Sequence, residues 1–536
     1  DKLYDAFYRS LAFGTAGLRG TIGVGTNRMN VYVVAQATQG LADYLNAHYQ
    51  NPTVALARDS RLKGEDFQKI AAGVLAANGI RVYVYPRIEP VPTLSFAVRY
   101  LKTSAGIVLT ASHNPAPYNG YKVYNDNGGQ ITDEAAAEIS ANIARVNPFD
   151  VKPMDFEEGL EKGLIMWTPE EVLDNFIEAI KRVSIPGFKA ADGYKVVYTP
   201  LNGTGMECVT RILKEIGVND VDVVPEQAEP DGNFPTCSYP NPEFREALEL
   251  GLKLADKVKP NLLVATDPDA DRVGVEVLQK DGSYLNLSGN QIGAIMAKYI
   301  LEAHKNAGTL PENAALCKSI VSTDLVTKIA ESYGATMFNV LTGFKFIAEK
   351  IQEFEEKHNH TYMMGFEESF GYLIKPFVRD KDAIQAVLVV AELAAYYRSR
   401  GLTLADGIEE IYKEYGYYAE KTISVTLSGV DGAEQIKAIM AKFRNNAPKE
   451  WNTTAITVVE DFKAQTATAA DGTVTNLTTP PSDVLKYTLA DGSWIAVRPS
   501  GTEPKIKFYI AVVGETNEDS QTKIANIEAE INAFVR

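Results

Sequence analysis

The sequence predicts an α/β protein of four domains, three of them α/β domains with mixed, mostly parallel sheets and the last an α+β domain. Two observations support this prediction. A strand–helix–strand pattern recurs at three distant positions, and the chain from about residue 416 onward follows a different pattern. The length of 536 residues is also too great for one hydrophobic core, so several domains are expected.

The first strand–helix–strand unit lies near the start of the chain. An apolar run at 53–57 predicts a strand, and a helical pattern follows over 64–77. Asn78-Gly79 is a typical helix stop, and 80–85 then predicts a second strand.

The same order of elements occurs twice more, with Gly217 and Gly334 as helix stops. The second unit comprises a strand at 194–198, a helix at about 205–216 and a strand at 221–224; the third comprises a strand at 319–322, a helix reaching 333 and a strand ending at 341. Units of this kind, joined in series, predict largely parallel sheets.

The C-terminal segment predicts a smaller α+β domain. Residues 421–427 alternate like a half-buried strand, 433–443 have helical periodicity, and Asp491-Gly492 indicates a hairpin turn. The Thr-, Ala- and Pro-rich stretch 466–481 is expected to be a mobile loop. We therefore expect four domains, which comprise residues 1–185, 186–300, 301–415 and 416–536.

Composition restricts the classes of function. The hydrophobic fraction of 45% and charged fraction of 23% are ordinary for a soluble globular protein, and no apolar run reaches the ~20 residues of a membrane span. A net charge of −16 argues against nucleic acid or an anionic membrane as partner. Any anionic substrate must then be held by local positive charge. Three widely spaced cysteines suit a reducing cytoplasm, and the five histidines show no zinc-site spacing.

The stretch 106–115, Gly-Ile-Val-Leu-Thr-Ala-Ser-His-Asn-Pro, carries the first chemical signal. Its apolar residues predict a buried strand that ends before Ser112. In open α/β sheets ligands bind beyond the carboxyl ends of the strands, so Ser112 is a candidate site residue. An ordinary turn is the alternative interpretation. His113 is its neighbour in sequence, a relation that rarely lets one side chain deprotonate the other.

Three aspartates, Asp267, Asp269 and Asp271, follow a second apolar strand. Pro268 disfavours a helix, and extended backbone would place all three carboxylates on one face. Such carboxylates repel one another unless a cation lies among them, and a short loop of hard oxygen ligands suits Mg²⁺. An EF-hand is excluded, because its required Gly and Glu positions hold Arg272 and Leu278. A solvated acidic turn is the alternative.

Three further stretches contain groups suited to sugar phosphates. Residues 365–372 offer Glu and Ser on a glycine-bounded loop, which can bind sugar hydroxyls or merely cap a helix. Residues 496–505 combine an arginine, two hydroxyls and a glycine backbone, a set typical of phosphate binding. The glycine-rich stretch 13–20 ends in an arginine that could reach an anion.

These loops resemble those of the α-D-phosphohexomutase superfamily, and within it the phosphoglucomutase branch most closely. The resemblance covers nearly the whole chain, in the family's order, and rests on FGTAGLRG (13–20), TASHNP (110–115), DPDADR (267–272), GFEESFGY (365–372) and RPSGTEP (498–504). It implies four domains around a central cleft and an intramolecular phosphotransferase that acts in glucose metabolism. A small-molecule sugar phosphate would be the partner, and the protein would be a monomer or homodimer.

The resemblance also implies roles for individual residues. Ser112 would carry a phosphoryl group, Asp267, Asp269 and Asp271 would hold Mg²⁺ with an oxygen on Ser112, and Arg19 or Lys122 would assist proton transfer. His113 also matches the family's reaction centre. The residues implied to bind substrate are Arg272, Thr342, Gly343, Glu367, Ser369, Lys381, Arg498, Ser500, Gly501 and Thr502.

The implied reaction is the interconversion of glucose 1-phosphate and glucose 6-phosphate through phosphoserine and glucose 1,6-bisphosphate, which would also activate the enzyme. Two departures qualify the resemblance. Relatives that handle both glucose and mannose often have GEMSGH at the sugar loop, whereas this chain has no histidine there. Asn202 stands where His is common. Phosphomannomutase, phosphopentomutase and a sugar-phosphate phosphatase are the alternatives.

Overall fold

The computed structural model describes residues 2–14, 17–185, 193–427, 432–500 and 505–535. The chain divides into two compact units. The first comprises Asp1–Leu316 with Phe344–Ala405, and the second comprises Cys317–Gly343 with Asp406–Arg536.

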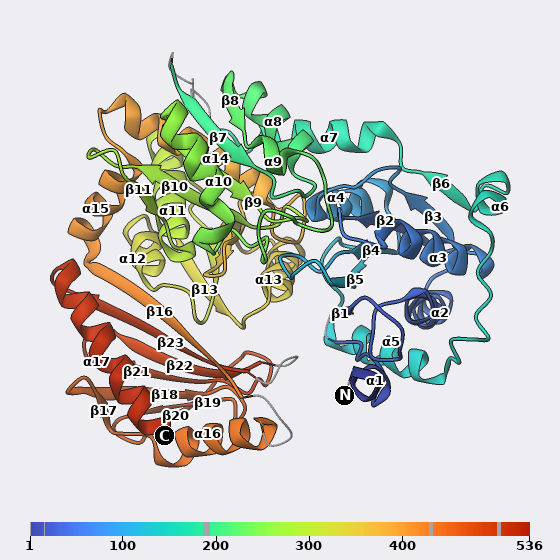
Figure 1. The fold of residues 1–536 in the computed structure, drawn as a ribbon. Coiled ribbons are helices and arrows are strands. Elements are labelled where there is room, and N and C mark those ends of the chain that lie inside the picture. Colours follow the sequence, from blue (N-terminus) through green and yellow to red (C-terminus); the bar gives the residue numbers. More distant parts are fainter. Residues whose placement is uncertain (1, 15–16, 186–192, 428–431, 501–504, 536) are drawn as a thin grey trace. The chain divides into compact units, whose positions relative to one another are not determined.

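The N-terminal sheet of the first unit has six strands in the order β1-β5-β4-β2-β3-β6 (Figure 1). The strands are β1 (Gly17–Thr21), β2 (Thr53–Arg58), β3 (Arg81–Val84), β4 (Ala105–Leu109), β5 (Tyr118–Asn125) and β6 (Ile165–Trp167). The pairs from β4 through β2 and β3 to β6 are parallel, whereas β1, β5 and β4 pair antiparallel. Because β2 and β4 are parallel, with Arg58 opposite Leu109, their carboxyl ends lie at the same edge.

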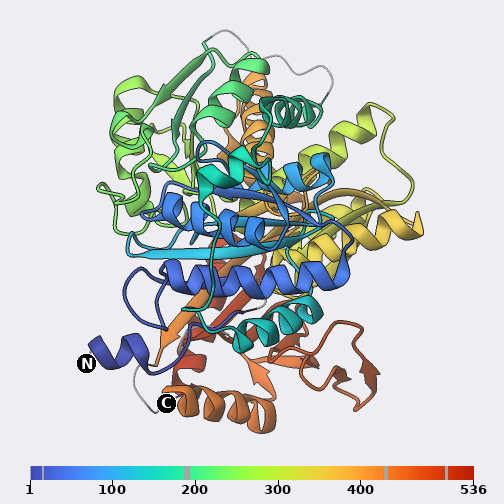
Figure 2. The ribbon, with the colours of Figure 1, turned by 90° about the vertical axis from the view of Figure 1, so that its right-hand side faces the viewer.

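Helices cover both faces of this sheet. The helices of this part of the chain are α1 (Lys2–Phe7), α2 (Val31–His48), α3 (Gly64–Ala77), α4 (Val91–Leu101), α5 (Asp133–Arg145), α6 (Phe156–Glu161) and α7 (Glu170–Lys181). Leu56 and Ile107 belong to a core shared with α2, α3 and α5, and α2 and α5 lie side by side in Figure 2. Gly106 faces the other way, toward Leu94 and Val98 of α4. The alternation of strand residues between the faces accounts for this layering.

A second sheet of the first unit has the order β11-β10-β9-β7-β8. Its strands are β7 (Lys195–Thr199), β8 (Asp220–Val223), β9 (Leu262–Thr266), β10 (Val273–Leu278) and β11 (Tyr284–Asn286), and its helices are α8 (Met206–Glu215), α9 (Pro225–Ala228), α10 (Arg245–Val258) and α11 (Gly289–Asn306). Strands β9 and β10 form an antiparallel pair in which Thr266 lies opposite Val273. The loop that joins them carries the three aspartates.

The remaining elements of the first unit are α13 (Phe344–Lys357), β14 (Thr361–Glu367), β15 (Gly371–Leu373) and α14 (Ala383–Ser399). Strands β14 and β15 pair antiparallel, and a further bridge joins Gly371 to Arg272 beside the aspartate loop. Helix α14 is buried along most of its length, which is consistent with its apolar sequence. In the described part of the chain, no helix is both long and apolar enough to span a membrane.

The second unit contains a large antiparallel sheet in the order β16-β23-β22-β21-β18-β19-β20, with β17 paired to β18. Its strands are β16 (Tyr417–Thr426), β17 (Glu450–Trp451), β18 (Thr454–Asp461), β19 (Thr466–Ala469), β20 (Val474–Asn476), β21 (Leu485–Leu489), β22 (Trp494–Pro499) and β23 (Lys505–Gly514). Helices α16 (Gly432–Asn446) and α17 (Asn517–Val535) share one hydrophobic core with this sheet. The α+β class predicted for the C-terminal segment is confirmed.

The second unit also includes α12 (Leu325–Ser332) and β13 (Thr336–Val340). Strand β12 (Ala314–Ser319) ends in it, and α15 (Leu404–Tyr415) leads into it. The predicted strand at 319–322 is therefore wrong. The strand lies earlier, and Ile320 and Val321 are buried in the turn that follows.

The predicted mobile loop at 466–481 is also wrong in part. Strands β19 and β20 form an antiparallel hairpin there. Thr466-Ala-Thr-Ala469 alternates β-branched and small residues, and Asp471-Gly472 supplies the turn, with Gly472 at φ +86°. By contrast, the helix predicted over 64–77 and the hairpin turn at Asp491-Gly492 are confirmed.

Gly120 on β5 lies close to neighbouring backbone, and a substitution there tests how tightly the first unit is packed. A Cβ there would lie 2.4 Å from the carbonyl oxygen of Thr110 and 2.8 Å from that of Leu18. Because backbone atoms cannot yield like a flexible side chain, Gly120→Ala should destabilise the first unit by about 1–3 kcal/mol. Gly23→Ala is the control, since its Cβ would make only ordinary contacts with the Arg28 side chain. Thermal unfolding of both variants checks this; equal transition temperatures would contradict the packing.

Candidate active site

Ser112 lies where the chain leaves β4, and its backbone is left-handed with φ of +52°. The residue is buried, and its N–H donates to Oγ1 of Thr110 at 2.8 Å. Its own Oγ lies 2.9 Å from Oδ2 of Asp267 and 3.1 Å from Nδ1 of His113. The fold thus brings together the serine and the aspartate loop, which are far apart in sequence.

The hydrogen bond between neighbouring Ser112 and His113 differs from expectation. The left-handed backbone at Ser112 turns the loop sharply, which allows the two side chains to meet. Burial, together with the nearby guanidinium groups of Arg272 and Arg19, holds the pKa of His113 well below its ordinary value. The imidazole is therefore neutral at pH 7.

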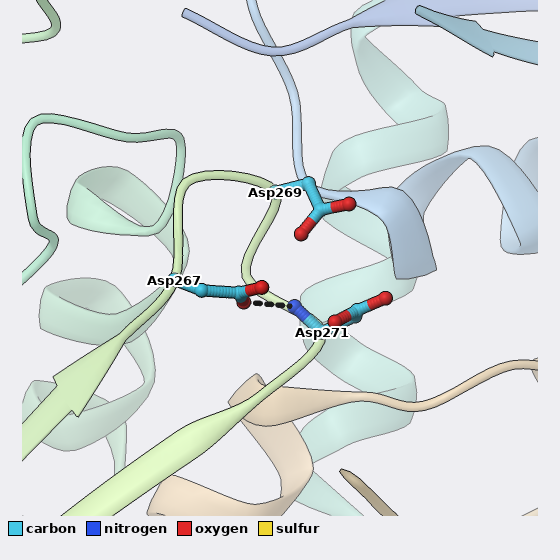
Figure 3. Close-up of side chains that lie close together, drawn as sticks. All are labelled: Asp267, Asp269 and Asp271. Atoms are coloured by element: carbon cyan, nitrogen blue, oxygen red, sulfur yellow. Dashed lines mark hydrogen bonds between the residues drawn. The ribbon is translucent and has the colours of Figure 1, made fainter. Parts of the chain in front are cut away.

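The three aspartates lie close together on the β9–β10 loop, as Figure 3 shows. Their carboxylates offer ligand atoms within 4.8 Å of one another, and all three residues are buried. The loop is a tight turn rather than the extended backbone that the sequence predicted, with Ala270 at φ +51°. Oδ1 of Asp267 accepts a hydrogen bond from the backbone N–H of Asp271 at 3.1 Å (Figure 3). It accepts a second from the N–H of Arg272 at 3.0 Å, and the two bonds close the turn.

Oδ1 of Asp269 and Oδ1 of Asp271 are buried without a hydrogen bond in the described structure. Oδ2 of Asp271 accepts none either, but it lies 3.3 and 3.6 Å from the ammonium groups of Lys381 and Lys122. Buried carboxylates seldom lack such partners unless a cation binds them. The cluster therefore fits a divalent metal ion bound by hard oxygen ligands.

The electrostatics of the cluster agree with this interpretation. Burial raises the pKa of Asp267 well above its ordinary value, and the neighbouring carboxylates of Asp269 and Asp271 raise it further. Although burial acts in the same direction on Asp271, the ammonium groups of Lys381 and Lys122 hold its pKa below the usual range. A cation among the three would remove the mutual repulsion that otherwise favours protonation.

Two lysines supply positive charge beside the aspartates. Nζ of Lys122, on β5, lies 3.1 Å from Oδ2 of Asp269, and Nζ of Lys381 lies 3.3 Å from Oδ2 of Asp271. Burial alone would lower the pKa of each lysine, but the carboxylates offset it and both pKa values lie above the ordinary one. Both side chains therefore remain cationic. This is the local positive charge that an anionic substrate needs on a chain with net charge −16.

Two arginines extend this positive region. Nη1 of Arg19, on β1, donates to the side-chain oxygen of Asn114 at 3.0 Å. Nη1 of Arg272 donates to Oε1 of Glu243 and to the carbonyl oxygen of Ser369, each at 2.9 Å. Arg272 therefore ties the aspartate loop to the β14–β15 loop.

The β14–β15 loop contains the predicted sugar-binding residues. Glu367 is the last residue of β14 and is buried, whereas Ser369 is partly exposed. Phe370 has φ of +67° and its carbonyl oxygen accepts from the N–H of Val273 at 3.2 Å. The loop is thus fixed to the start of β10.

Comparison with known families and proteins decides what kind of protein carries this site. The four domain models described as phosphoglucomutase/phosphomannomutase match it: alpha/beta/alpha domain I at 10–148, domain II at 174–280, domain III at 288–415 and the C-terminal domain at 431–531. A phosphoglucomutase of Staphylococcus haemolyticus is 37% identical over 522 residues, 97% of this chain and 93% of that protein. The chain belongs to the phosphoglucomutase/phosphomannomutase family. It is accordingly a mutase, an enzyme of the isomerase class, with phosphohexomutase activity.

Other relatives agree. A phosphoglucomutase of Staphylococcus aureus is 37% identical over 524 residues, with 97% of this chain and 93% of that protein covered. Among solved structures, a Thermus thermophilus protein described as a phosphomannomutase has a TM-score of 0.72 at 21% identity, covering 98% of this chain and 99% of that one. Parafusin from Paramecium has a TM-score of 0.72 at 18% identity, covering 98% and 95%. These two likenesses show the shared fold.

The other predicted substrate-binding residues of this family member belong to the second unit. Thr342 and Gly343 follow β13. The hydroxyl of Thr342 is buried without a hydrogen bond in the described structure. The backbone of Gly343 has a φ of +126°. Nη1 of Arg498, on β22, lies 3.5 Å from the Tyr509 hydroxyl. Ser500 follows β22, and its N–H donates to the carbonyl of Lys505 at 2.8 Å. Gly501 and Thr502 lie outside the described residues.

Sequence reasoning missed three residues around Ser112. Oγ1 of Thr110 lies 2.6 Å from Oδ2 of Asp59 and 3.0 Å from Oδ2 of Asp269. Asp59 pairs with Arg61, whose Nε lies 3.3 Å away, and both side chains are fully buried. Burial raises the pKa of Asp59 to about 6, although Arg61 opposes the rise. Charged residues directly after the apolar strand β2 were the available signal, because β2 and β4 end at the same edge.

Proposed function

We propose that this mutase interconverts glucose 1-phosphate and glucose 6-phosphate through a phosphoserine at Ser112 and a glucose 1,6-bisphosphate intermediate. The observation that carries the proposal is the 2.9 Å contact between Oγ of Ser112 and Oδ2 of Asp267. A hydroxyl beside a buried acidic cluster that can hold a metal cation is suited to carry a group whose transfer requires charge neutralisation. The phosphoglucomutase relatives, at 37% identity, support the choice of glucose phosphates.

In the proposed cycle, phospho-Ser112 donates its phosphoryl group to the free hydroxyl of a sugar monophosphate. The P–O bond to Oγ of Ser112 breaks while a P–O bond to the sugar oxygen forms; the sugar hydroxyl gives up its proton, and Ser112 Oγ gains one. After the bisphosphate has turned over, its other phosphoryl group returns to Ser112. In that step the Ser112 hydroxyl gives up its proton and the released sugar oxygen gains one. In the structure this hydroxyl donates to Oδ2 of Asp267 at 2.9 Å, and Nδ1 of His113 lies 3.1 Å from the same Oγ.

Asp267, Asp269 and Asp271 would hold Mg²⁺, which supplies charge neutralisation for the transferred phosphoryl group when bound. An Aspergillus fumigatus N-acetylphosphoglucosamine mutase with the same fold, at a TM-score of 0.53, was solved in complex with GlcNAc-6P and magnesium. Lys122 stays protonated, because its pKa lies above the ordinary value. Its role in this proposal is therefore to stabilise negative charge rather than to act as the base.

Specificity is proposed to come from the β14–β15 loop, with Glu367 and Ser369 binding the sugar's 3- and 4-hydroxyls. Arg498, Ser500, Gly501 and Thr502 of the second unit would bind the phosphate that is not transferred. A loop held by backbone and side-chain bonds from Arg272 and Val273 is well suited to recognise fixed hydroxyl positions.

The expected substrate preference tests this function. Glucose 1-phosphate and mannose 1-phosphate differ only in the orientation of the 2-hydroxyl, and the dual-specificity histidine is absent from the loop. A misplaced hydroxyl that leaves a buried partner unpaired costs about 1–3 kcal/mol, so kcat/KM should favour glucose 1-phosphate by roughly tenfold to a hundredfold. Assays with glucose, mannose and ribose 1-phosphates, side by side and with glucose 1,6-bisphosphate as activator, measure this ratio.

Equal efficiency on the two hexoses would overturn the specificity claim, as would a preference for ribose 1-phosphate. Release of free phosphate in place of a hexose 6-phosphate would overturn the mutase cycle itself, because a phosphatase passes the group to water. A lag that added glucose 1,6-bisphosphate removes is expected, since this compound phosphorylates Ser112.

A further inference from the structure

Arg61 is a buried arginine outside the predicted site. It lies in the connection between β2 and α3, and its side chain is 0% exposed. A buried guanidinium costs free energy unless its donors and its charge are matched. The partners of Arg61 therefore indicate what the residue does.

The guanidinium of Arg61 donates to the backbone of the serine loop. Its Nη2 donates to the carbonyl oxygens of Ser112 and Asn114, at 2.5 and 2.6 Å. Its Nη1 donates to the carbonyl oxygens of Pro115 and Tyr118, each at 3.0 Å. One side chain thus binds four carbonyl groups in the stretch from Ser112 to Tyr118, the first residue of β5.

The rest of the guanidinium is fixed from behind. Nε lies 3.3 Å from Oδ2 of Asp59, and the Phe234 ring lies 5.1 Å from the guanidinium carbon. The same Asp59 oxygen lies 2.6 Å from Oγ1 of Thr110, which accepts the N–H of Ser112. Asp59 and Arg61 therefore hold Ser112 from both its N–H and its carbonyl side.

We infer that Arg61 is a positioning residue for phosphoryl transfer to and from Ser112. It keeps Ser112 in its left-handed conformation, with Oγ directed at Asp267. Through the carbonyl of Asn114, whose side chain binds Arg19, it also fixes the position of Arg19. This inference rests on the proposed function of Ser112. It adds that the geometry of the transfer is set by a residue that does not touch the reacting atoms.

Lysine cannot replace this arrangement, because an ammonium has only three donors on one nitrogen, whereas the guanidinium directs its donors in a fixed planar fork. Arg61→Lys keeps the positive charge opposite Asp59 but leaves loop carbonyls without donors. A displacement of about 1 Å at the nucleophile can cost about a hundredfold in rate. We expect kcat of Arg61→Lys to fall about that much, with KM for glucose 1-phosphate nearly unchanged.

The direct measurement is the rate at which glucose 1,6-bisphosphate phosphorylates Ser112, followed by rapid quench and intact mass. This rate should fall with kcat in Arg61→Lys and stay at the wild-type value in Arg58→Lys. Arg58 is the control because it lies at the end of β2, close in sequence, but its Nε binds the side chain of Gln68. If Arg61 had a purely structural role, Arg61→Lys would lower the unfolding temperature without slowing phosphoryl transfer to Ser112 in the protein that remains folded.

A wild-type phosphorylation rate in folded Arg61→Lys would overturn the inference. So would a rise in KM without a slower transfer. If Arg61→Lys does not fold, Asp59→Asn provides a second test, since it removes the negative charge beside Arg61 but keeps a side chain of the same size. This variant also alters the contact with Thr110, so slower transfer would implicate the Asp59–Arg61 pair as a whole, whereas unchanged transfer would overturn the inference. Absence of phosphate on wild-type Ser112 would contradict the proposed function instead, so the two failures are distinguishable.

Discussion

Replacing Ser112 by alanine is expected to lower mutase turnover by roughly 10³–10⁶-fold, because it removes the proposed covalent carrier of the phosphoryl group. The fold should persist. Alanine can adopt the same backbone conformation as serine, and the hydrogen bond from the residue 112 N–H to Thr110 is unaffected by the change. The loss is that of the hydroxyl which contacts Asp267.

Turnover of glucose 1-phosphate, intact mass and thermal unfolding together measure this effect. Wild-type protein incubated with glucose 1,6-bisphosphate should gain one phosphate, whereas Ser112→Ala should gain none. Ser399→Ala is a matched control, because that hydroxyl donates only to a carbonyl at the end of α14. Near-normal turnover in Ser112→Ala would refute the phosphoserine mechanism while leaving membership of the family intact.

The fold was predictable where burial and periodicity agree in the local sequence. Helix α3 matches its predicted bounds because its apolar period and the stop at Asn78-Gly79 coincide. The strand at 319–322 was misplaced because Ile320 and Val321 are buried in a turn rather than a strand. Lys318 Nζ donates to the carbonyl of Ser322 at 3.1 Å, an interaction that hydrophobic patterning does not indicate.

The candidate site was predictable as separate loops but not as an assembly. The motifs identified Ser112 and the three aspartates, since each follows an apolar strand and resembles a family loop. The roles of Arg61 and Thr110 depend on the pairing of β2 with β4, which sets their carboxyl ends side by side. The close approach of the aspartates likewise depends on the left-handed backbone of Ala270, and alanine gives no sequence signal for that conformation.

Chelation of divalent metal should abolish turnover, and Mg²⁺ should restore it better than Ca²⁺. Both ions can be coordinated by the carboxylate oxygens of the aspartate loop, but Ca²⁺ takes more ligands at longer and more variable distances. A phosphoryl group in transfer needs a fixed position, so the looser geometry should support less activity. Turnover in chelator, followed by titration with each ion, measures the difference. Full activity in chelator without added metal would refute the site.

Asp269→Asn separates metal binding from the rest of the mechanism. Oδ1 of Asp269 accepts no hydrogen bond in the described structure, so this carboxylate oxygen is available to a metal ion. In asparagine one of the two carboxylate oxygens becomes an NH₂ group, which cannot bind a metal ion in the same way, and the negative charge is lost. A ligand that binds only the folded state raises stability by mass action, about 2.7 kcal/mol at a hundred times its Kd. Wild-type protein should therefore gain unfolding temperature with Mg²⁺, and Asp269→Asn should need more Mg²⁺ for the same gain. Asp281→Asn, in an exposed turn of the first unit, should respond like wild type. Equal Mg²⁺ dependence in all three proteins would show that the metal binds elsewhere.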